Sequence, residues 1–211
     1  MANAMAIDKN HHSTQRILKR CIDLNLSFLL LLLLSPLFVL IALLIVLDDG
    51  WPVLYRRRVI GQKGEFDAFK FRSMRRDADV VLANDPVLKL EFEQNFKLKN
   101  DPRLTRLGRY LRTLSLDELP QLINVLKGQM SLVGPRMITA REISKYGEYK
   151  HLLLRVKPGI TGYWQINGRQ DVSYEQRVRM DISYVENWSL LKDLKILVLT
   201  PVKVFKREGA Y

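Results

Sequence analysis

Residues 24–47 read LNLSFLLLLLLSPLFVLIALLIVL, and the rest of the chain is organised around this stretch. It contains no charged residue, and Asp23 and Asp48 stand at its two ends. As a helix it would reach about 36 Å, which exceeds the roughly 30 Å of a bilayer's hydrocarbon core. A helix that is apolar on every side does not suit a water-soluble domain. We therefore expect this stretch to enter a membrane.

Two features argue against a simple spanning helix. Pro36 follows Ser35 at the middle of the stretch, where proline removes a backbone hydrogen bond. Basic residues also flank both ends, although a spanning helix favours them on the cytoplasmic side; they are Lys9, Arg16, Lys19 and Arg20 before it and Arg56, Arg57, Arg58 and Lys63 after it. The residues alone leave two interpretations open, a re-entrant hairpin bent at Ser35-Pro36 and a kinked single-pass anchor. In both, Arg16, Lys19 and Arg20 are expected at the depth of the lipid headgroups.

The composition indicates an anionic partner. The chain has 211 residues and a net charge of +12, and the membrane stretch favours lipid or phosphate over nucleic acid. Residues 1–50 are expected to form an N-terminal tail and the membrane helix, and residues 51–211 one compact domain. Cys21 is the single cysteine, which fits a reducing compartment.

The expected fold class is α+β and mostly helical, with a re-entrant membrane hairpin helix, a small globular domain, a β-hairpin and interfacial amphipathic helices. Patterning and turn residues place its elements. They are strands at 53–60 and 65–73 around a four-residue loop at 61–64; helices within 74–99, interrupted near 84–86, and around 104–111; a helix from 115–117 to 127; a helix opened by Thr139 and Glu142; a short β-like segment at 163–167; a helix capped by Ser173; and an amphipathic helix at 190–205 with a stripe at Leu190, Leu194, Leu197 and Pro201.

Lys70 and Arg72 alternate with Phe69 and Phe71 in the second strand. Alternation points the two basic side chains to the same face. They could hold a phosphate there, or simply form a solvated edge.

The most informative polar motif is Ser115-Leu116-Asp117-Glu118-Leu119-Pro120. Since proline is tolerated only in the first turn of a helix, the helix should start at Ser115 to Asp117. Asp117 and Glu118 would then lie at a helix N-terminus, which favours ionised carboxylates. Capping alone also explains them, because Ser115 and Glu118 have the spacing of a capping box.

Two arginines flank this acidic pair in sequence. Arg112 precedes it, and Arg136 ends the motif Gly134-Pro135-Arg136 after the helix. An ionised aspartate can act as a nucleophile without a base, its neighbour can hold Mg²⁺, and arginines can stabilise a transferring phosphoryl group. The motif therefore suggests a phosphoryl-transfer site.

A glycine-rich loop follows further along the chain, at residues 157–169. Glycines let a backbone approach a nucleotide closely, although structural turns look the same. The candidate nucleotide-binding residues are Lys157, Gly159, Thr161, Gly162, Gln165 and Arg169.

With these motifs in view, the chain resembles the monotopic phosphoglycosyl transferases, bacterial sugar transferases that load undecaprenyl phosphate. The resemblance covers Arg16 to about Phe205 and rests on five motifs in order; these are the apolar helix with Ser35-Pro36, Lys70-Phe71-Arg72-Ser73-Met74, residues 114–121, Met130 to Arg136, and Lys157 to Gly162. It implies that the Ser-Pro helix is re-entrant. It also implies a location in the cytoplasmic leaflet of the bacterial inner membrane.

The resemblance also implies a mechanism. Asp117 resembles the nucleophile that attacks a UDP-sugar, releasing UMP and leaving an aspartyl phosphosugar that undecaprenyl phosphate then attacks. Glu118 resembles the Mg²⁺ ligand, Arg112 and Arg136 resemble phosphate-binding arginines, and the loop at 157–169 matches a segment near the nucleotide. The chain departs from the family in having Met137 where many members have a second proline, and in lacking the multi-pass N-terminal region of longer members.

Other interpretations remain at this level. One is a membrane-anchored basic adaptor without catalysis, although no nucleic-acid-binding signature is present and we expect no nucleic-acid partner. Another is direct transfer with Asp117 as a general base. The sequence leaves open the sugar, for which galactose or glucose is the expectation, and the oligomeric state, with which a homo-oligomer is compatible.

Overall fold

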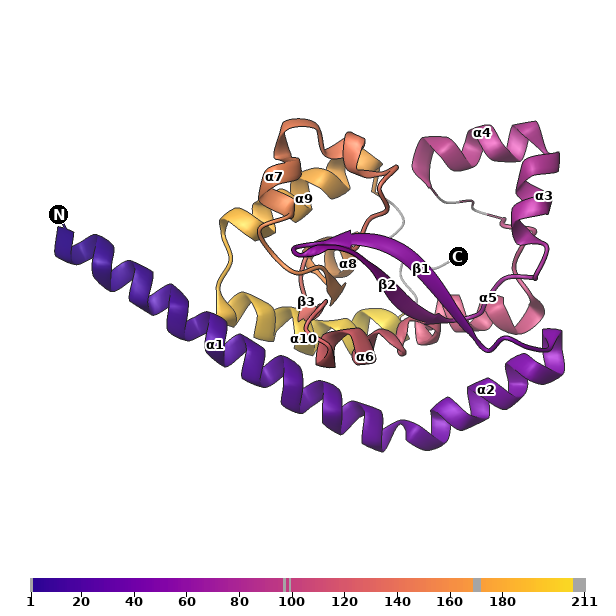
Figure 1. Cartoon of the computed structure of the whole chain (residues 1–211), viewed down its shortest axis with the longest axis horizontal. Helices are drawn as coiled ribbons and strands as arrows, with labels where there is room; N and C mark the ends of the chain where they lie inside the picture. The colour runs from indigo at the N-terminus through magenta and orange to yellow at the C-terminus, as the bar shows by residue number, and fades with distance from the viewer. Residues whose placement is uncertain (1, 97, 99, 169–171, 207–211) are drawn as a thin grey trace.

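The computed structural model describes residues 2–96, 98, 100–168 and 172–206. Its apolar stretch forms two helices, α1 (Ala2–Leu33) and α2 (Ser35–Asp49), with a 60° bend between Ser13–Leu33 and Ser35–Asp49 (Figure 1). Pro36 cannot donate to the carbonyl of Leu32, and the Ser35 hydroxyl donates to that oxygen instead, at 2.8 Å. The predicted bend at Ser35-Pro36 is therefore confirmed, and the serine compensates for the proline.

Neither helix alone is long and apolar enough to cross a bilayer, and the same holds for every other helix in the described part of the chain. The segments Ser13–Leu33 and Ser35–Asp49 pass that test only together, as a bent pair.

A β-hairpin follows the bent pair. Strands β1 (Leu54–Gly61) and β2 (Gly64–Phe71) are antiparallel, with Gly61 opposite Gly64. The turn therefore has two residues, Gln62 and Lys63, rather than the four predicted, because the two glycines close the ladder. Tyr55 lies opposite Lys70 and Arg57 opposite Ala68, so these four side chains share one face.

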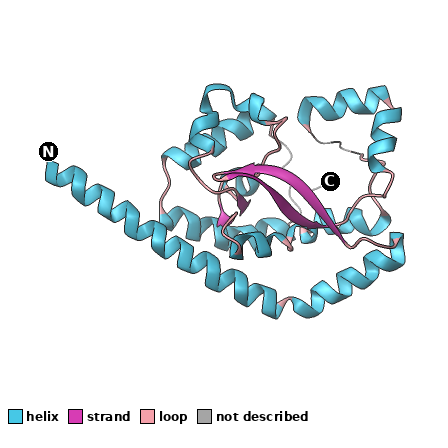
Figure 2. Ribbon diagram, in the orientation of Figure 1, coloured by secondary structure: helices cyan, strands magenta, loops and turns pink. Residues whose placement is uncertain are grey.

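Helices make up most of the remaining structure, which confirms the α+β, mostly helical fold class (Figure 2). The predicted break before Pro86 and the capping box of Ser173 and Gln176 are also confirmed. The elements are α3 (Ala78–Asn84), α4 (Pro86–Asn95), α5 (Arg106–Thr113), η1 (Leu116–Glu118), α6 (Gln121–Leu126), β3 (Ser131–Val133), η2 (Ile143–Tyr149), α7 (Lys150–Leu153), β4 (Gly159–Thr161), α8 (Tyr163–Asn167), α9 (Tyr174–Glu186) and α10 (Leu190–Phe205).

The elements predicted after Thr139 and at residues 163–167 also differ from the structure. Residues 163–167 form helix α8, not a β-like segment, since the partner strand β3 ends at Val133 and leaves them no ladder to join. Glu142 does accept hydrogen bonds from the backbone and side chain of Thr139, but the element that follows, η2, is a 3₁₀ helix.

Both arms of the bent pair pack against the domain, which lies on the inner side of the bend (Figure 1). Leu26, Leu30 and Leu31 of α1 pack on the core formed by the hairpin, α6 and β3. Ile41 and Ile45 of α2 share a second cluster with Phe71 and Leu111.

The opposite sides of α1 and α2 remain exposed and apolar. We call this surface the outer face; its exposed side chains are Ile17, Leu18, Leu24, Phe28, Leu29, Leu32, Leu33, Val39, Leu40, Leu43, Leu44 and Leu47. Helix α10 carries a second exposed stripe of Leu191, Leu194, Val198, Val202 and Phe205, which differs from the predicted stripe because α10 turns Asp193 and Ile196 inward. Contiguous apolar surface of this kind marks a membrane or protein contact.

Candidate active site

Asp117 and Glu118 lie on the 3₁₀ turn η1, not in the first turn of the following α-helix as predicted. Pro120 has no N–H to donate to Leu116. Instead, the chain forms 3₁₀-type hydrogen bonds between residues three apart, from Leu119 N to Leu116 O and from Leu122 N to Leu119 O. Ser115 has a φ of 55° and makes no capping hydrogen bond to the turn, so the predicted capping box does not form. Side-chain capping by Ser115 therefore does not explain the 3₁₀ conformation of this turn.

Lys70 is the immediate partner of this acidic pair. Its Nζ donates to Glu118 Oε1 at 2.6 Å and lies 3.8 Å from Asp117 Oδ2. Burial works against ionisation of Glu118, but the charges of Lys70 and Arg136 and the Lys70 hydrogen bond outweigh it and lower its pKa to about 2. Burial raises the pKa of Asp117 despite the opposing charge of Lys70. The surroundings thus shift the pKa values of the two carboxyl groups in opposite directions.

Arg112 and Arg136 stand close enough for their charges to oppose the rise in the pKa of Asp117 that burial causes. Arg112 donates from Nε to Ser73 Oγ at 3.0 Å. The Arg136 guanidinium lies 5.4 Å from the centre of the Trp164 ring. The structure therefore brings together Asp117, Glu118, Lys70, Arg112 and Arg136, which sequence reasoning proposed as one site.

Arg57 is a further cation at this site, and sequence reasoning missed it as a site residue. It shares the hairpin face of Lys70, and its charge contributes to the lowered pKa of Glu118. Its Nη2 lies 3.3 Å from Glu142 Oε2, which fixes its position. The available signal was strand alternation in Arg56-Arg57-Arg58, which turns the middle residue to the face of Lys70 and its neighbours away.

Arg72 has different partners from Lys70, contrary to their expected joint role. It lies beyond the end of β2 and donates to the Asp49 carboxylate and to the backbone oxygens of Asp49 and Gly50. Arg72 therefore binds the end of α2, away from the acidic pair.

The glycine-rich loop also has a structural partner of its own. β4 runs parallel to β3, with Gly134 N donating to Thr161 O and Gly159 N to Pro135 O. A Cβ on Gly159 would lie 2.1 Å from Gly134 N, and one on Gly162 would lie 2.2 Å from Gly134 O. These glycines are thus required by contact with the Gly134-Pro135-Arg136 loop.

The other predicted nucleotide-binding residues each have different neighbours. Thr161 Oγ1 bonds Thr200 of α10, and Gln165 Nε2 donates to Ile160 O. Burial, with nearby Arg20, lowers the pKa of Lys157, which places Lys157 beside α1. Arg169 lies outside the described residues.

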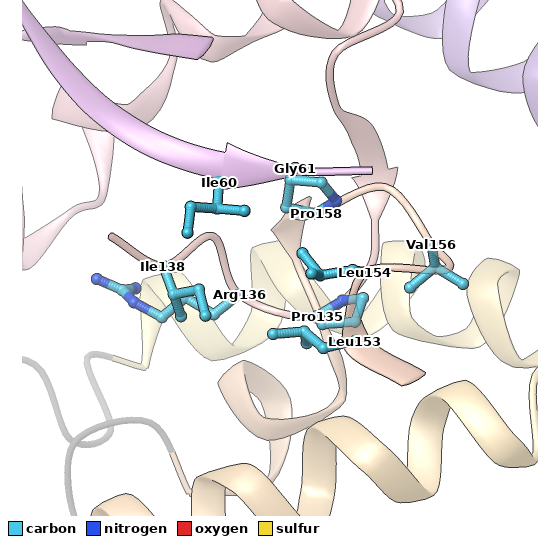
Figure 3. Close-up of a pocket in the computed structure, with 9 residues that line it drawn as sticks. All are labelled: Ile60, Gly61, Pro135, Arg136, Ile138, Leu153, Leu154, Val156 and Pro158. Atoms are coloured by element: carbon cyan, nitrogen blue, oxygen red, sulfur yellow. The ribbon is translucent and has the colours of Figure 1, made fainter. Parts of the chain in front are cut away.

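A small apolar pocket lies behind the Gly134-Pro135-Arg136 loop (Figure 3). Its lining residues come from the end of β1, this loop and residues 153–158. Neither Asp117 nor Glu118 lines it, and the Arg136 guanidinium points away from Leu154 and Val156. The acidic pair, not this pocket, is the candidate site.

No group of three or more His, Cys, Asp or Glu within the described residues is placed to hold a metal ion. The adjacent oxygen donors of Asp117 and Glu118 nevertheless fit Mg²⁺. That ion usually takes one or two carboxylates and fills its shell with water and substrate phosphates.

Known proteins are similar to this chain over nearly its whole length. The model of the family described as "Bacterial sugar transferase" matches residues 14–207. The chain is 47% identical over 203 residues to "Undecaprenyl-phosphate galactose phosphotransferase" of Salmonella typhimurium, covering 94% of this chain and 42% of that protein. It is 42% identical over 205 residues to "UDP-glucose:undecaprenyl-phosphate glucose-1-phosphate transferase" of Escherichia coli, covering 93% and 42%. It is 46% identical over 198 residues to "Exopolysaccharide production protein ExoY" of Rhizobium meliloti, covering 92% and 88%. The chain thus spans less than half the length of the first two relatives.

Proposed function

The chain belongs to the bacterial sugar transferase family, and on that premise we propose that it transfers a sugar 1-phosphate from a UDP-sugar to undecaprenyl phosphate. The observation that carries this proposal is the pair Asp117–Glu118 on one 3₁₀ turn, within reach of basic side chains from several elements. These basic side chains are Lys70, Arg112, Arg136 and Arg57. Such a site suits a substrate with two phosphates, because cations can stabilise charge on both the transferring and the leaving group.

The first half of the reaction uses Asp117 as nucleophile. One carboxylate oxygen attacks the phosphorus that carries the sugar. An acyl phosphate bond forms, the bond between the two phosphates breaks, and UMP leaves with the bonding electrons. The buried position of Asp117, 5% exposed, keeps water from competing for the aspartyl phosphosugar.

In the second half, an oxygen of undecaprenyl phosphate attacks the same phosphorus. The bond to Asp117 breaks, the carboxylate is restored, and undecaprenyl diphosphate-sugar is the product. Arg112 and Arg136 orient the phosphate groups in both halves, and Lys70 holds Glu118 in its ionised form. Bound Mg²⁺ would be held by Glu118, with Asp117 beside it, and would supply charge neutralisation for the diphosphate.

We also propose a location in the cytoplasmic leaflet of the bacterial inner membrane, with the bent pair α1–α2 as a re-entrant hairpin. Support comes from the 60° bend, the exposed apolar outer face and the exposed stripe of α10. Both helix arms would then return the chain to the side where a dissolved UDP-sugar is available.

Replacing Pro36 with alanine should favour a straight helix, because alanine restores the N–H that pairs with Leu32 O. Cysteines introduced at Thr14 and Asp77, on either side of the bent pair, should then react with an impermeant reagent from opposite faces of the membrane. In the chain that keeps Pro36, both introduced cysteines should react from the same face. Unchanged labelling in the Pro36 variant would show that proline does not determine the topology.

Arg57→Gln should raise the KM for the UDP-sugar about tenfold, because one cation is removed from the phosphate site. Arg58→Gln is the matched control, since Arg58 is exposed on the other face of the same strand and pairs with Glu65 and Asp67. Equal kinetics for the two variants would assign Arg57 to a purely structural contact with Glu142.

The direct test is a UMP-release assay of the purified chain in nanodiscs with undecaprenyl phosphate and Mg²⁺. UDP-galactose and UDP-glucose are the first donors, given what the names of the Salmonella and Escherichia relatives state. We expect sustained release of UMP, beyond a single turnover of the chain, to depend on both donor and acceptor. A chain that binds acidic vesicles but releases no UMP from any UDP-sugar would favour the adaptor function.

A further inference from the structure

One face of α1 carries three charged side chains that point into the domain. Lys19, Arg20 and Asp23 lie within a single helical turn or so, and their partners all belong to the catalytic domain. Lys19 and Arg20 therefore have protein partners, and their position at the depth of the lipid headgroups stays a prediction. We call these three residues the α1 brace.

Asp23 holds strand β3. Its side chain is 4% exposed and accepts hydrogen bonds from Ser131 Oγ at 2.8 Å and from the backbone N–H of Leu132 at 3.0 Å. A buried carboxylate is costly unless it is satisfied in this way. Asp23 thus fixes the position of α1 along its axis relative to strand β3.

Lys19 holds the end of the same strand. Its Nζ donates to Val133 O at 2.9 Å and to Asp193 Oδ2 at 2.6 Å. Asp193 of α10 is itself 2% exposed and also accepts from the Tyr184 hydroxyl and the Trp188 indole N–H. The anchoring point of Lys19 is therefore a fully bonded buried carboxylate.

Arg20 contacts the C-terminal end of helix α6. Its guanidinium donates to Val125 O at 2.7 Å and to Leu126 O at 3.2 Å, at the end of α6. α6 follows the turn that carries Asp117 and Glu118, while β3 leads directly into Gly134-Pro135-Arg136. The helix that follows the acidic turn and the strand that leads into Arg136 are thus both bonded to one turn of α1.

From these contacts we propose that the α1 brace positions the catalytic carboxylates relative to Arg136, so that the seating of α1 controls the rate of the chemical step. The inference rests on the proposed function. Burial of Leu26, Leu30 and Leu31 of α1 is non-directional, whereas hydrogen bonds to backbone atoms require a defined distance and angle. The brace residues act through other groups and are positioning residues.

The test compares Asp23→Ala with Asp23→Asn in the nanodisc-bound chain. Alanine removes both bonds to β3, while asparagine can accept from Leu132 N–H and donate to Ser131 Oγ. We expect alanine to lower kcat for UMP release about tenfold or more with little change in the donor KM, because misplacement costs transition-state contacts. Asparagine should restore kcat to within about threefold. Cys21→Ala and Asn25→Ala, on the exposed side of α1, are the matched controls and should leave kcat unchanged.

Amide hydrogen exchange supplies a readout that does not depend on activity. Residues 131–136 should exchange faster in Asp23→Ala than in the unmodified chain, and in neither control. If Asp23→Ala does not fold, Ser131→Ala removes one of the two bonds and should still lower kcat a few-fold. Normal kcat and exchange in a folded variant would overturn the brace. Absence of UMP release by the unmodified chain would instead contradict the proposed function, with the exchange result still testing the brace.

Discussion

Asp117→Asn is expected to abolish sugar phosphate transfer, with kcat falling about 10⁴-fold or more. The amide has nearly the shape of the carboxylate but cannot attack phosphorus. Burial already raises the pKa of Asp117, so the neutral amide should be tolerated and the fold retained. The measurement is UMP release by a variant whose thermal unfolding matches that of the unmodified chain.

Intact-mass analysis distinguishes covalent from direct transfer. With UDP-sugar and no acceptor, the unmodified chain should gain the mass of a sugar phosphate on Asp117, and Asp117→Asn should not. Turnover without such an adduct would favour Asp117 as a general base. Substantial turnover by Asp117→Asn would remove Asp117 from the chemistry altogether.

Glu118→Gln is expected to raise the Mg²⁺ concentration needed for half-maximal rate about 10- to 100-fold. The pKa of Glu118 is lowered to about 2, so at neutral pH its side chain is ionised and could offer a charged oxygen to Mg²⁺, which glutamine could not. The measurement is a Mg²⁺ titration of UMP release at saturating donor.

The control for this prediction is Glu65→Gln on the same hairpin, where an exposed carboxylate pairs with Arg58. It should leave the titration unchanged. An identical Mg²⁺ dependence in Glu118→Gln would mean that Glu118 serves only to pair with Lys70.

Sequence reasoning succeeded where one local rule dominates. Pro36 cannot donate a hydrogen bond, so a bend in the apolar stretch was predictable from two residues. The hairpin was equally clear from its paired glycines, and the helix after Ser173 from its capping box. Each of these depends on neighbours in the chain.

It failed where a shape depends on several residues at once or on a partner that is distant in sequence. The shape of the turn at Asp117 depends on Ser115 and Pro120 together, and the helical form of residues 163–167 on where β3 ends. The close approach of the glycines at 159 and 162 to Gly134 was not predicted, while their approach to a nucleotide stays a prediction. Periodicity carries no information about such contacts.

The site itself was predicted in part. The acidic pair, Lys70 and the two arginines were identified from motifs, whereas Arg72 was assigned by alternation to a strand that ends one residue before it. Arg57 was counted only as a flanking charge, because its proximity to Glu118 depends on hairpin register and on Glu142.

The uncovered leucines of α1 and α2 have a practical consequence at the bench. Such a surface cannot stay dispersed in plain buffer, so the isolated chain should carry a belt of amphiphile through every purification step. Stripping that belt should cause the particles to coalesce, and a change in light scattering on detergent removal would report it.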